Sequence, residues 1–378
     1  MGILIHMTRY SILLTVGLLS LAFRANAIDE PDAFVDSTES SQLAPNIDKG
    51  NWVVAPIPIS NPTLGTGLQL AVLYLHPARG NSDDSPNATT GLGLMYTDTD
   101  SWFAGLFHKT YLYDDSLRLM AAAGKGSLQL KYFGSGGGGL LASNPVGYSL
   151  DADVGFARAQ WRLPGTEHWF LGPAYVYGQG DVTLDFSSLV PTLPAVGKNI
   201  LISGLGLTLT YDSRDNNYYP TRGADFGISS FYYGDDLGSD FSFSKTTAYL
   251  SNYFPVSPKL VVASNAYYET GAGDIPFFML ASPGVRGYDR GRYMDDGALK
   301  LSIESRYQFR ARWSVVGFYD YGWVSDKADR ILSGETAFSI GGGIRWQTTP
   351  DKPLNLGLDV AYTGDSDAVV FIQIGERF

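Results

Sequence analysis

The chain has 378 residues, of which 44% are hydrophobic, and it carries a net charge of −11 and no cysteine. An acidic chain lacks the basic face that nucleic acid requires, and the lack of cysteine excludes a disulfide framework and any thiolate metal site. Glycine (44 residues), tyrosine (24) and phenylalanine (20) are abundant. Aromatic residues favour strands and membrane interfaces, and glycine favours turns, so the composition indicates an antiparallel barrel of the bacterial outer membrane.

The first 27 residues have the pattern of a cleaved secretory signal peptide, in which Arg9 precedes an apolar run over 10–23 and Ala25-Asn26-Ala27 completes the cleavage site. The apolar run is 14 residues long, whereas a membrane helix needs about 20, so a membrane anchor is the less favoured alternative. Residues 28–50 are acidic and turn-rich, which predicts a short disordered periplasmic tail before a barrel over 51–378.

From residue 51 onward, segments in which apolar and polar residues alternate recur between turn signals. Over 298–309, the apolar positions share one parity and would face lipid, while Glu304 and the other polar positions would face a wet lumen. A soluble sandwich would also alternate, but the aromatic residues fall near strand ends and no second apolar set is present for a sandwich core. The sixteen predicted strands are 52–60, 64–76, 89–97, 101–112, 116–132, 147–162, 168–184, 199–212, 223–234, 241–254, 258–271, 297–309, 312–325, 336–347, 354–363 and 368–378.

The connections between these strands predict the orientation of the barrel. From a periplasmic N-terminus, the up-and-down order puts short turns in the periplasm and the longer connections at 133–146, 185–198 and 272–296 outside, as in bacterial barrels. The last of these is the sixth external loop.

The two ends of the barrel carry further signals. Pro56 and Pro58 remove hydrogen-bond donors from the first strand, which predicts poor pairing on at least one side unless the prolines precede the first paired residue. The terminal Phe378 resembles the signal by which the outer-membrane assembly machinery recognises its clients, although Glu376 departs from that pattern. This resemblance implies that the chain is itself a client of that machinery.

The sixth loop contains Val285-Arg286-Gly287-Tyr288. This motif resembles the V/I-R-G-F/Y motif of the superfamily of BamA/TamA-like outer-membrane assembly proteins and two-partner-secretion transporters, also called the bacterial surface antigen family. In that family the loop folds back into the barrel, and its arginine pairs with acids on the inner wall.

Other segments carry the same resemblance, which is strong over 200–378 and weaker before. Ser302-Ile303-Glu304 resembles the acid of the family's strand twelve, and Gly317-Phe318-Tyr319-Asp320-Tyr321-Gly322 resembles its G-F-x-D-x-G pattern in strand thirteen. The segments 211–223 and 341–354 resemble the family's turn between strands eight and nine and its hairpin between strands fourteen and fifteen. Family members carry periplasmic POTRA domains before the barrel, and residues 28–50 are too few for one, so the expected match is a branch without them.

The residues also fit this interpretation chemically. Glu304 and Asp320 share the inward parity of neighbouring strands, and a guanidinium has five fixed donors that can serve two carboxylates at once. We therefore expect Arg286 to be bound between these acids, with Gly287 allowing a close approach to the wall. The alternative is a solvated basic loop that attracts lipopolysaccharide phosphates, and this is the role expected of Arg290 and Arg292.

No enzymatic motif stands out. The glycine run 134–139 lacks the Lys-Ser/Thr of a phosphate cradle and predicts a flexible outer loop. His76, His108 and His168 lack metal-ligand spacing, and hydrolase motifs are missing. We expect neither a catalytic site nor a metal or other cofactor.

The predicted protein is a non-enzymatic outer-membrane barrel that helps insert or move polypeptide or lipid across the membrane. Its expected partners are outer-membrane lipids, lipopolysaccharide, the assembly machinery and an unfolded polypeptide or lipid substrate. The alternative is a passive diffusion channel or a structural barrel.

Overall fold

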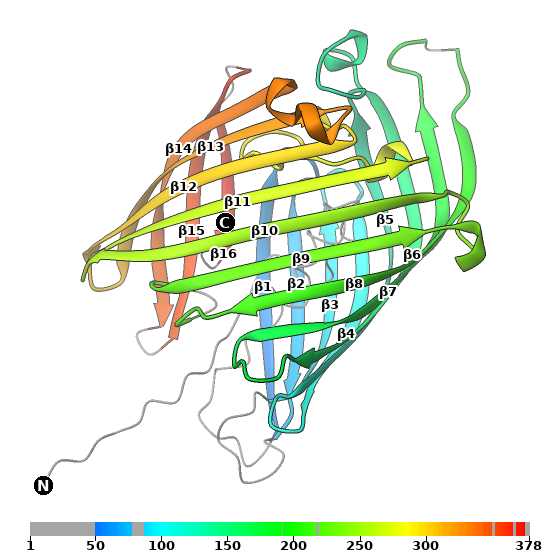
Figure 1. Ribbon diagram of the computed structural model, residues 1–378. Helices are drawn as coiled ribbons and strands as arrows, with labels where there is room; N and C mark the ends of the chain where they lie inside the picture. The colour runs from blue at the N-terminus through cyan, green and yellow to red at the C-terminus, as the bar shows by residue number, and fades with distance from the viewer. Residues whose placement is uncertain are drawn as a thin grey trace, which may run out of the picture.

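The computed structural model describes residues 50–77, 87–190, 192–216, 219–349, 352–365 and 368–374. Sixteen antiparallel strands form one sheet in which each strand pairs with its neighbours in the sequence, and the sheet curves into a nearly closed barrel (Figure 1). The predicted sixteen-stranded all-β barrel is therefore confirmed. The strands are β1 (Asn51–Asn61), β2 (Gly65–Leu75), β3 (Thr89–Thr97), β4 (Trp102–Leu112), β5 (Leu117–Tyr132), β6 (Val146–Arg162), β7 (Trp169–Asp185), β8 (Val196–Asp212), β9 (Gly223–Tyr233), β10 (Phe243–Ser257), β11 (Leu260–Gly273), β12 (Gly297–Arg310), β13 (Trp313–Ser325), β14 (Glu335–Thr349), β15 (Lys352–Thr363) and β16 (Ala368–Ile374).

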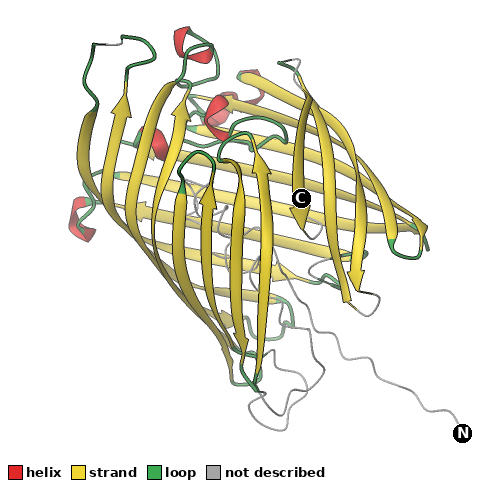
Figure 2. Cartoon of the chain, turned by 180° about the vertical axis from the view of Figure 1, so that it is seen from behind, coloured by secondary structure: helices red, strands yellow, loops and turns green. Residues whose placement is uncertain are grey.

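The helical structure within the described residues consists of short 3₁₀ turns in the loops (Figure 2). None of the helices there has the length and apolar character needed to cross a bilayer. The turns are η1 (Leu140–Ala142), η2 (Asp235–Leu237), η3 (Phe277–Met279), η4 (Arg290–Arg292) and η5 (Ala328–Ser333).

The alternation of side chains follows the predicted parity. On β12, Leu301 and Ile303 are exposed on the outer face, while Glu304 is buried on the inner face. The inner face is not uniformly polar, however. The inward positions of β1–β10 carry a cluster of buried apolar side chains that includes Phe107 and Phe231. The polar inner face expected at 298–309 does not extend to this part of the wall, because its inward positions are filled by large aromatic and aliphatic residues.

The connection between β11 and β12, residues 274–296, is called loop six below. It contains η3 and η4, and its Phe278 and Met279 belong to the apolar cluster of the inner wall. The glycine run also contacts loop six, because Gly136 N donates to the carbonyl of Met294 at 2.8 Å. The backbone of this predicted outer loop is thus hydrogen-bonded to loop six.

The first and last strands form a seam. Pro56 and Pro58 pair with Leu70 and Leu68 of β2 in an unbroken register, so the alternative that the prolines precede the paired residues is wrong. Residues two apart direct their backbone groups to the same edge of a strand, and proline has no N–H, so both proline nitrogens lie on the edge away from β2. Within the described residues, β16 contacts that edge without a ladder of paired residues.

Candidate functional site: an arginine between two strands

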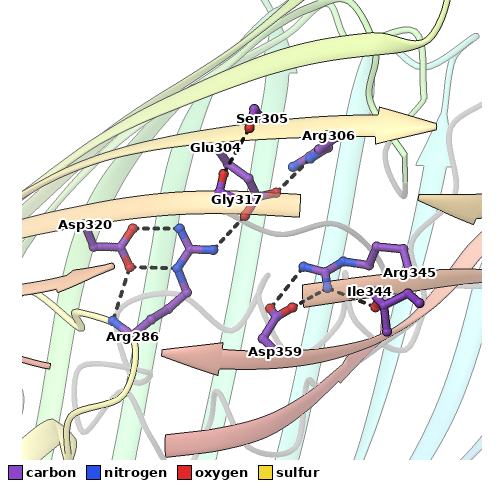
Figure 3. A network of polar contacts seen from close by, with 9 residues as sticks. All are labelled: Arg286, Glu304, Ser305, Arg306, Gly317, Asp320, Ile344, Arg345 and Asp359. Atoms are coloured by element: carbon purple, nitrogen blue, oxygen red, sulfur yellow. Dashed lines mark hydrogen bonds and ion pairs between the residues drawn. The ribbon is translucent and has the colours of Figure 1, made fainter. Parts of the chain in front are cut away.

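Loop six reaches the inner wall through Arg286. Its Nε and one terminal nitrogen donate to the two oxygens of Asp320, each at 2.7 Å, and its other terminal nitrogen donates to Glu304 Oε2 at 2.6 Å (Figure 3). The backbone N–H of Arg286 adds a bond of 3.2 Å to Asp320. The planar guanidinium thus binds one carboxylate in a bidentate manner and a second one at its other end.

The register of the sheet explains why two acids meet one arginine. Glu304 lies on β12 opposite Phe318 of β13, and Asp320 lies two residues beyond Phe318 on the same face. The two carboxylates are therefore diagonal neighbours on the inner face. Both are almost fully buried, with 1% and 0% of their surfaces exposed.

Burial and charge act in opposite directions on Arg286. Desolvation lowers the pKa of its guanidinium, but the ion pairs with Asp320 and Glu304 outweigh that effect and raise the pKa further above its ordinary value. Arg286 therefore stays charged at any pH at which the barrel is folded.

An aromatic side chain supports the guanidinium. The Cζ atom of Arg286 lies 3.6 Å from the ring centroid of Phe318, within the range of a cation–π contact. The ring has room because β14 carries a glycine beneath it, where a Cβ on Gly341 would lie 2.3 Å from Phe318 Cζ. The Phe318 predicted in the strand-thirteen pattern thus contacts the loop arginine.

Glycines let the loop approach the wall closely. A Cβ on Gly322 would lie 2.7 Å from Val285 Cγ2, and Val285 is buried against that position. Gly287 has a φ of +90°, and a Cβ there would lie 2.8 Å from Thr363 Cγ2. Gly317 differs, since the nearest atom to a Cβ there would be Ser305 Oγ at 3.6 Å, so it takes no part in this packing.

We expect Gly287→Ala to weaken the attachment of loop six more than Gly284→Ala does. Both residues have positive φ, so each alanine costs about 1–2 kcal/mol of backbone strain, but only the Cβ at Gly287 also meets a neighbouring side chain, whereas none lies within 4 Å of Gly284. The rate of limited proteolysis in loop six measures the difference. Equal rates for the two variants would show that the close approach at Gly287 does not matter.

Tyr288 attaches the following residue of loop six to β14 and to the turn after β15. Its hydroxyl donates to the carbonyl of Phe338 at 3.2 Å and accepts from the backbone N–H of Gly364 at 2.7 Å. Its ring also meets that of Tyr293 edge-on at 5.3 Å. The motif therefore contacts four strands, β12 to β15, and the turn after β15.

The polar network extends beyond the predicted residues. Glu304 Oε1 also accepts from Arg306 Nε at 2.8 Å, and Arg306 donates to the carbonyl of Pro220 at 3.3 Å. Arg345 and Asp359 form a second buried ion pair on β14 and β15 (Figure 3). Glu304 is thus shared between loop six and an arginine that binds the turn between β8 and β9.

Another buried ion pair holds the opposite side of loop six, and it was not predicted from the sequence. Lys245 of β10 lies 2.5 Å from Glu269 of β11, and its ammonium donates to the carbonyl of Met279 at 2.7 Å. Tyr267 donates to Glu269 at 2.5 Å. The inward parity of Lys245 and Glu269 was readable, but only the register between β10 and β11 shows that they meet.

The contacts of the remaining loop residues differ from expectation. Arg292 was expected to be solvated or to face lipid, but it binds Asp365 at 3.2 Å and donates to the carbonyl of Gly137. The backbone N–H of Arg290 donates to Thr63 Oγ1 at 2.9 Å. The expectation of a solvated charge is wrong for Arg292 because an acid from the last external turn lies beside it.

Asp289 lies at the contact between loop six and the β1–β2 turn. Its carboxylate accepts from Gly291 N at 3.0 Å and from the Thr63 hydroxyl at 3.4 Å. Burial raises the pKa of Asp289 to about 6, even though these hydrogen bonds act in the opposite direction.

Some predictions lie outside the described residues, namely the signal peptide over 1–27, the tail up to residue 49 and Phe378.

Within the described parts of the chain, no group of three or more His, Asp or Glu side chains is arranged to hold a metal ion.

Comparisons with known proteins agree with this architecture. No curated protein sequence matches the chain. Among solved structures, BamA from Haemophilus ducreyi lacking POTRA domains 1–3 is similar with a TM-score of 0.59 and 15% identity, over 87% of this chain and 70% of that one. CdiB from Escherichia coli is similar with a TM-score of 0.56 and 11% identity, over 97% of this chain and 76% of that one. CdiB from Acinetobacter baumannii has the same TM-score and identity, over 87% of this chain and 59% of that one.

These identities are low and show a common fold. The family itself is shown by the sequence, because the model described as the Omp85 superfamily domain matches residues 149–378, more than half of the chain. Barrels of this superfamily reside in the Gram-negative outer membrane. The chain is therefore an outer-membrane β-barrel that belongs to the Omp85 superfamily.

Proposed function

We propose that this barrel assists the insertion or translocation of polypeptide or lipid at the outer membrane. The observation that carries the proposal is the seam between β1 and β16. Every other pair of neighbouring strands is joined by a ladder of paired residues, whereas the described residues of β1 and β16 are in contact without one. Pro56 and Pro58 remove two donors from that edge, so among the described residues separating β1 from β16 breaks fewer backbone hydrogen bonds than separating another pair.

Loop six supports assisted movement over passive diffusion. A diffusion channel needs an open, polar path, whereas loop six contacts the inner wall at Asp320 and Glu304 on one side and at Lys245 on the other. A substrate would therefore need either a rearrangement of loop six or a route through the seam. We include in the proposal the partners that such a role requires, namely outer-membrane lipids, lipopolysaccharide, a client polypeptide or lipid, and the machinery that inserts the barrel itself.

Closing the seam covalently tests the proposal, and the lack of native cysteine makes the design simple. One cysteine is placed on β1 and one on β16, and the oxidised protein is reconstituted into vesicles to measure insertion of an unfolded barrel polypeptide and flipping of a fluorescent phospholipid. A matched pair at Leu70 and Leu94, which are directly opposite on β2 and β3, serves as the control. We expect the seam disulfide to abolish the activity and reduction to restore it, while the control pair has no effect.

The same preparations address the alternative. Large and steady ionic conductance in planar bilayers, unchanged by the seam disulfide, together with no insertion or flipping, would favour a diffusion channel and overturn the proposal.

A further inference from the structure

A groove of about 460 Å³ lies on the outward face of β4 to β8. The register explains its shape. His108, Ala121, Ala157, Tyr175 and Leu205 are directly paired in sequence across the five strands, so they form one row on the outer face. Two alanines lie between large side chains in this row, and the surface is hollow where the alanines are.

The groove is almost entirely apolar at its floor. Ala159 and Pro173, the neighbours of that row on β6 and β7, also line it. Tyr175 and Leu205 are exposed on the outer face and form one rim, while His108 and Thr110 line the opposite one. Because this surface faces the bilayer, an apolar chain is the ligand that such a floor can accept.

Aromatic residues indicate the height of the groove in the bilayer. Trp161 is exposed on β6 two residues beyond Ala159, towards the turn that follows β6. The rings of Trp169 and Tyr211 meet at 4.9 Å at the same end of β7 and β8. Aromatic girdles mark the membrane interfaces of barrels, so the groove lies on the hydrocarbon side of the periplasmic interface.

A polar triad adjoins the groove on the β4 side. Thr90 Oγ1 lies 2.8 Å from His76 Nε2 and 2.9 Å from His108 Nδ1, so its hydroxyl connects the two imidazoles. The two rings meet edge-on at 5.5 Å. A hydroxyl and two imidazoles thus form a connected group of polar side chains beside the apolar groove.

We propose that this groove and triad bind one phospholipid of the periplasmic leaflet, with an acyl chain along Ala121, Ala157 and Ala159 and the phosphate beside His76, Thr90 and His108. An apolar groove that is continuous with hydrogen-bonding groups at the membrane interface matches a molecule that is apolar at one end and anionic at the other. The site lies on the outside of the barrel and is independent of the activity proposed for the lumen and seam.

Photo-cross-linking in lipid nanodiscs tests the acyl-chain part. The probe is a phosphatidylethanolamine with a diazirine in one acyl chain, and we expect labelled peptides from 117–121 and 157–175. Ala157→Trp fills the groove and should lower this labelling about fivefold, the loss expected from a few van der Waals contacts. The matched control is Ala266→Trp on the outward face of β11, which is opposite the exposed Leu301 and should leave the labelling unchanged.

Even labelling around the barrel, or equal labelling of the two tryptophan variants, would overturn the proposal. Heat-modifiability on gels confirms that each variant is folded. If Ala157→Trp does not fold, the smaller substitution Ala121→Leu fills the same row, and the same reduction is expected.

A second comparison tests the phosphate part. The double variant with Thr90→Val and His108→Phe should lower labelling by the phospholipid probe but not by a diacylglycerol that carries the same diazirine chain. An equal effect on both probes, or no effect on either, would show that the triad does not bind the phosphate.

Discussion

Replacing Arg286 with alanine should release loop six from the inner wall. The substitution leaves the buried carboxylate of Asp320 without its bidentate partner and removes one of the two arginines that donate to Glu304. Removing one member of a buried ion pair costs about 3–5 kcal/mol, because the remaining charge stays in a poorly solvated place. We expect cleavage of loop six by proteinase K to accelerate strongly and channel conductance to rise, as measured in vesicles and planar bilayers.

Two variants serve as controls for that result. Arg292→Ala removes a pair with Asp365, whose side chain is 41% exposed, and a bond to the Gly137 carbonyl, but it leaves no carboxylate buried, so the loss should be smaller than at Arg286. Arg286→Lys keeps the charge but loses the two parallel bonds, so its effect should be intermediate. The proposed attachment would be wrong if Arg286→Ala behaved like Arg292→Ala in both measurements.

Lys245→Met should destabilise the barrel and free the η3 end of loop six. The substitution leaves Glu269, which is fully buried, with the Tyr267 hydroxyl but without the ammonium, and it removes the donor to the Met279 carbonyl. The expected loss is again about 3–5 kcal/mol. Equilibrium unfolding in urea, followed by tryptophan fluorescence and by heat-modifiability, measures it.

The double variant Lys245→Met with Glu269→Gln should recover much of this loss, because no unpaired charge remains buried. Lys125→Met is the surface control, since Lys125 pairs with Asp153 at 3.0 Å while 65% and 60% of the two side chains are exposed. If the single variant at Lys245 unfolded like the one at Lys125, the buried pair would have no structural importance.

The contacts of Arg286 illustrate what could be read from the sequence. Period-two alternation placed Glu304 and Asp320 on the inner face, and the short turn between their strands makes them neighbours whatever the rest of the barrel does. The strands themselves were equally readable, because an alternation of ten residues bounded by turn signals has few other interpretations. Both inferences depend only on local sequence.

The features that were missed depend on the path of loop six. Lys245 and Glu269 are on neighbouring strands, but their importance comes from the Met279 carbonyl, and a loop of this length can take many routes. Arg292 meets Asp365, which is 73 residues away. The alternation of the sequence shows which apolar side chains of β1–β10 point inward, but it does not show what they pack against. Their partners include Phe278 and Met279, which come from loop six.

The proline-bearing edge of β1 also has a consequence for how the barrel folds. Hairpins of consecutive strands close short loops, whereas β1 and β16 are the two strands farthest apart in the sequence and have the largest entropic cost of being brought together. Because Pro56 and Pro58 have no N–H, this contact is also the one with the least backbone hydrogen bonding among the described residues to offset its entropic cost. We therefore expect the cylinder to be sealed last during folding, and the open sheet that precedes this step to be the species most exposed to mispairing with another chain.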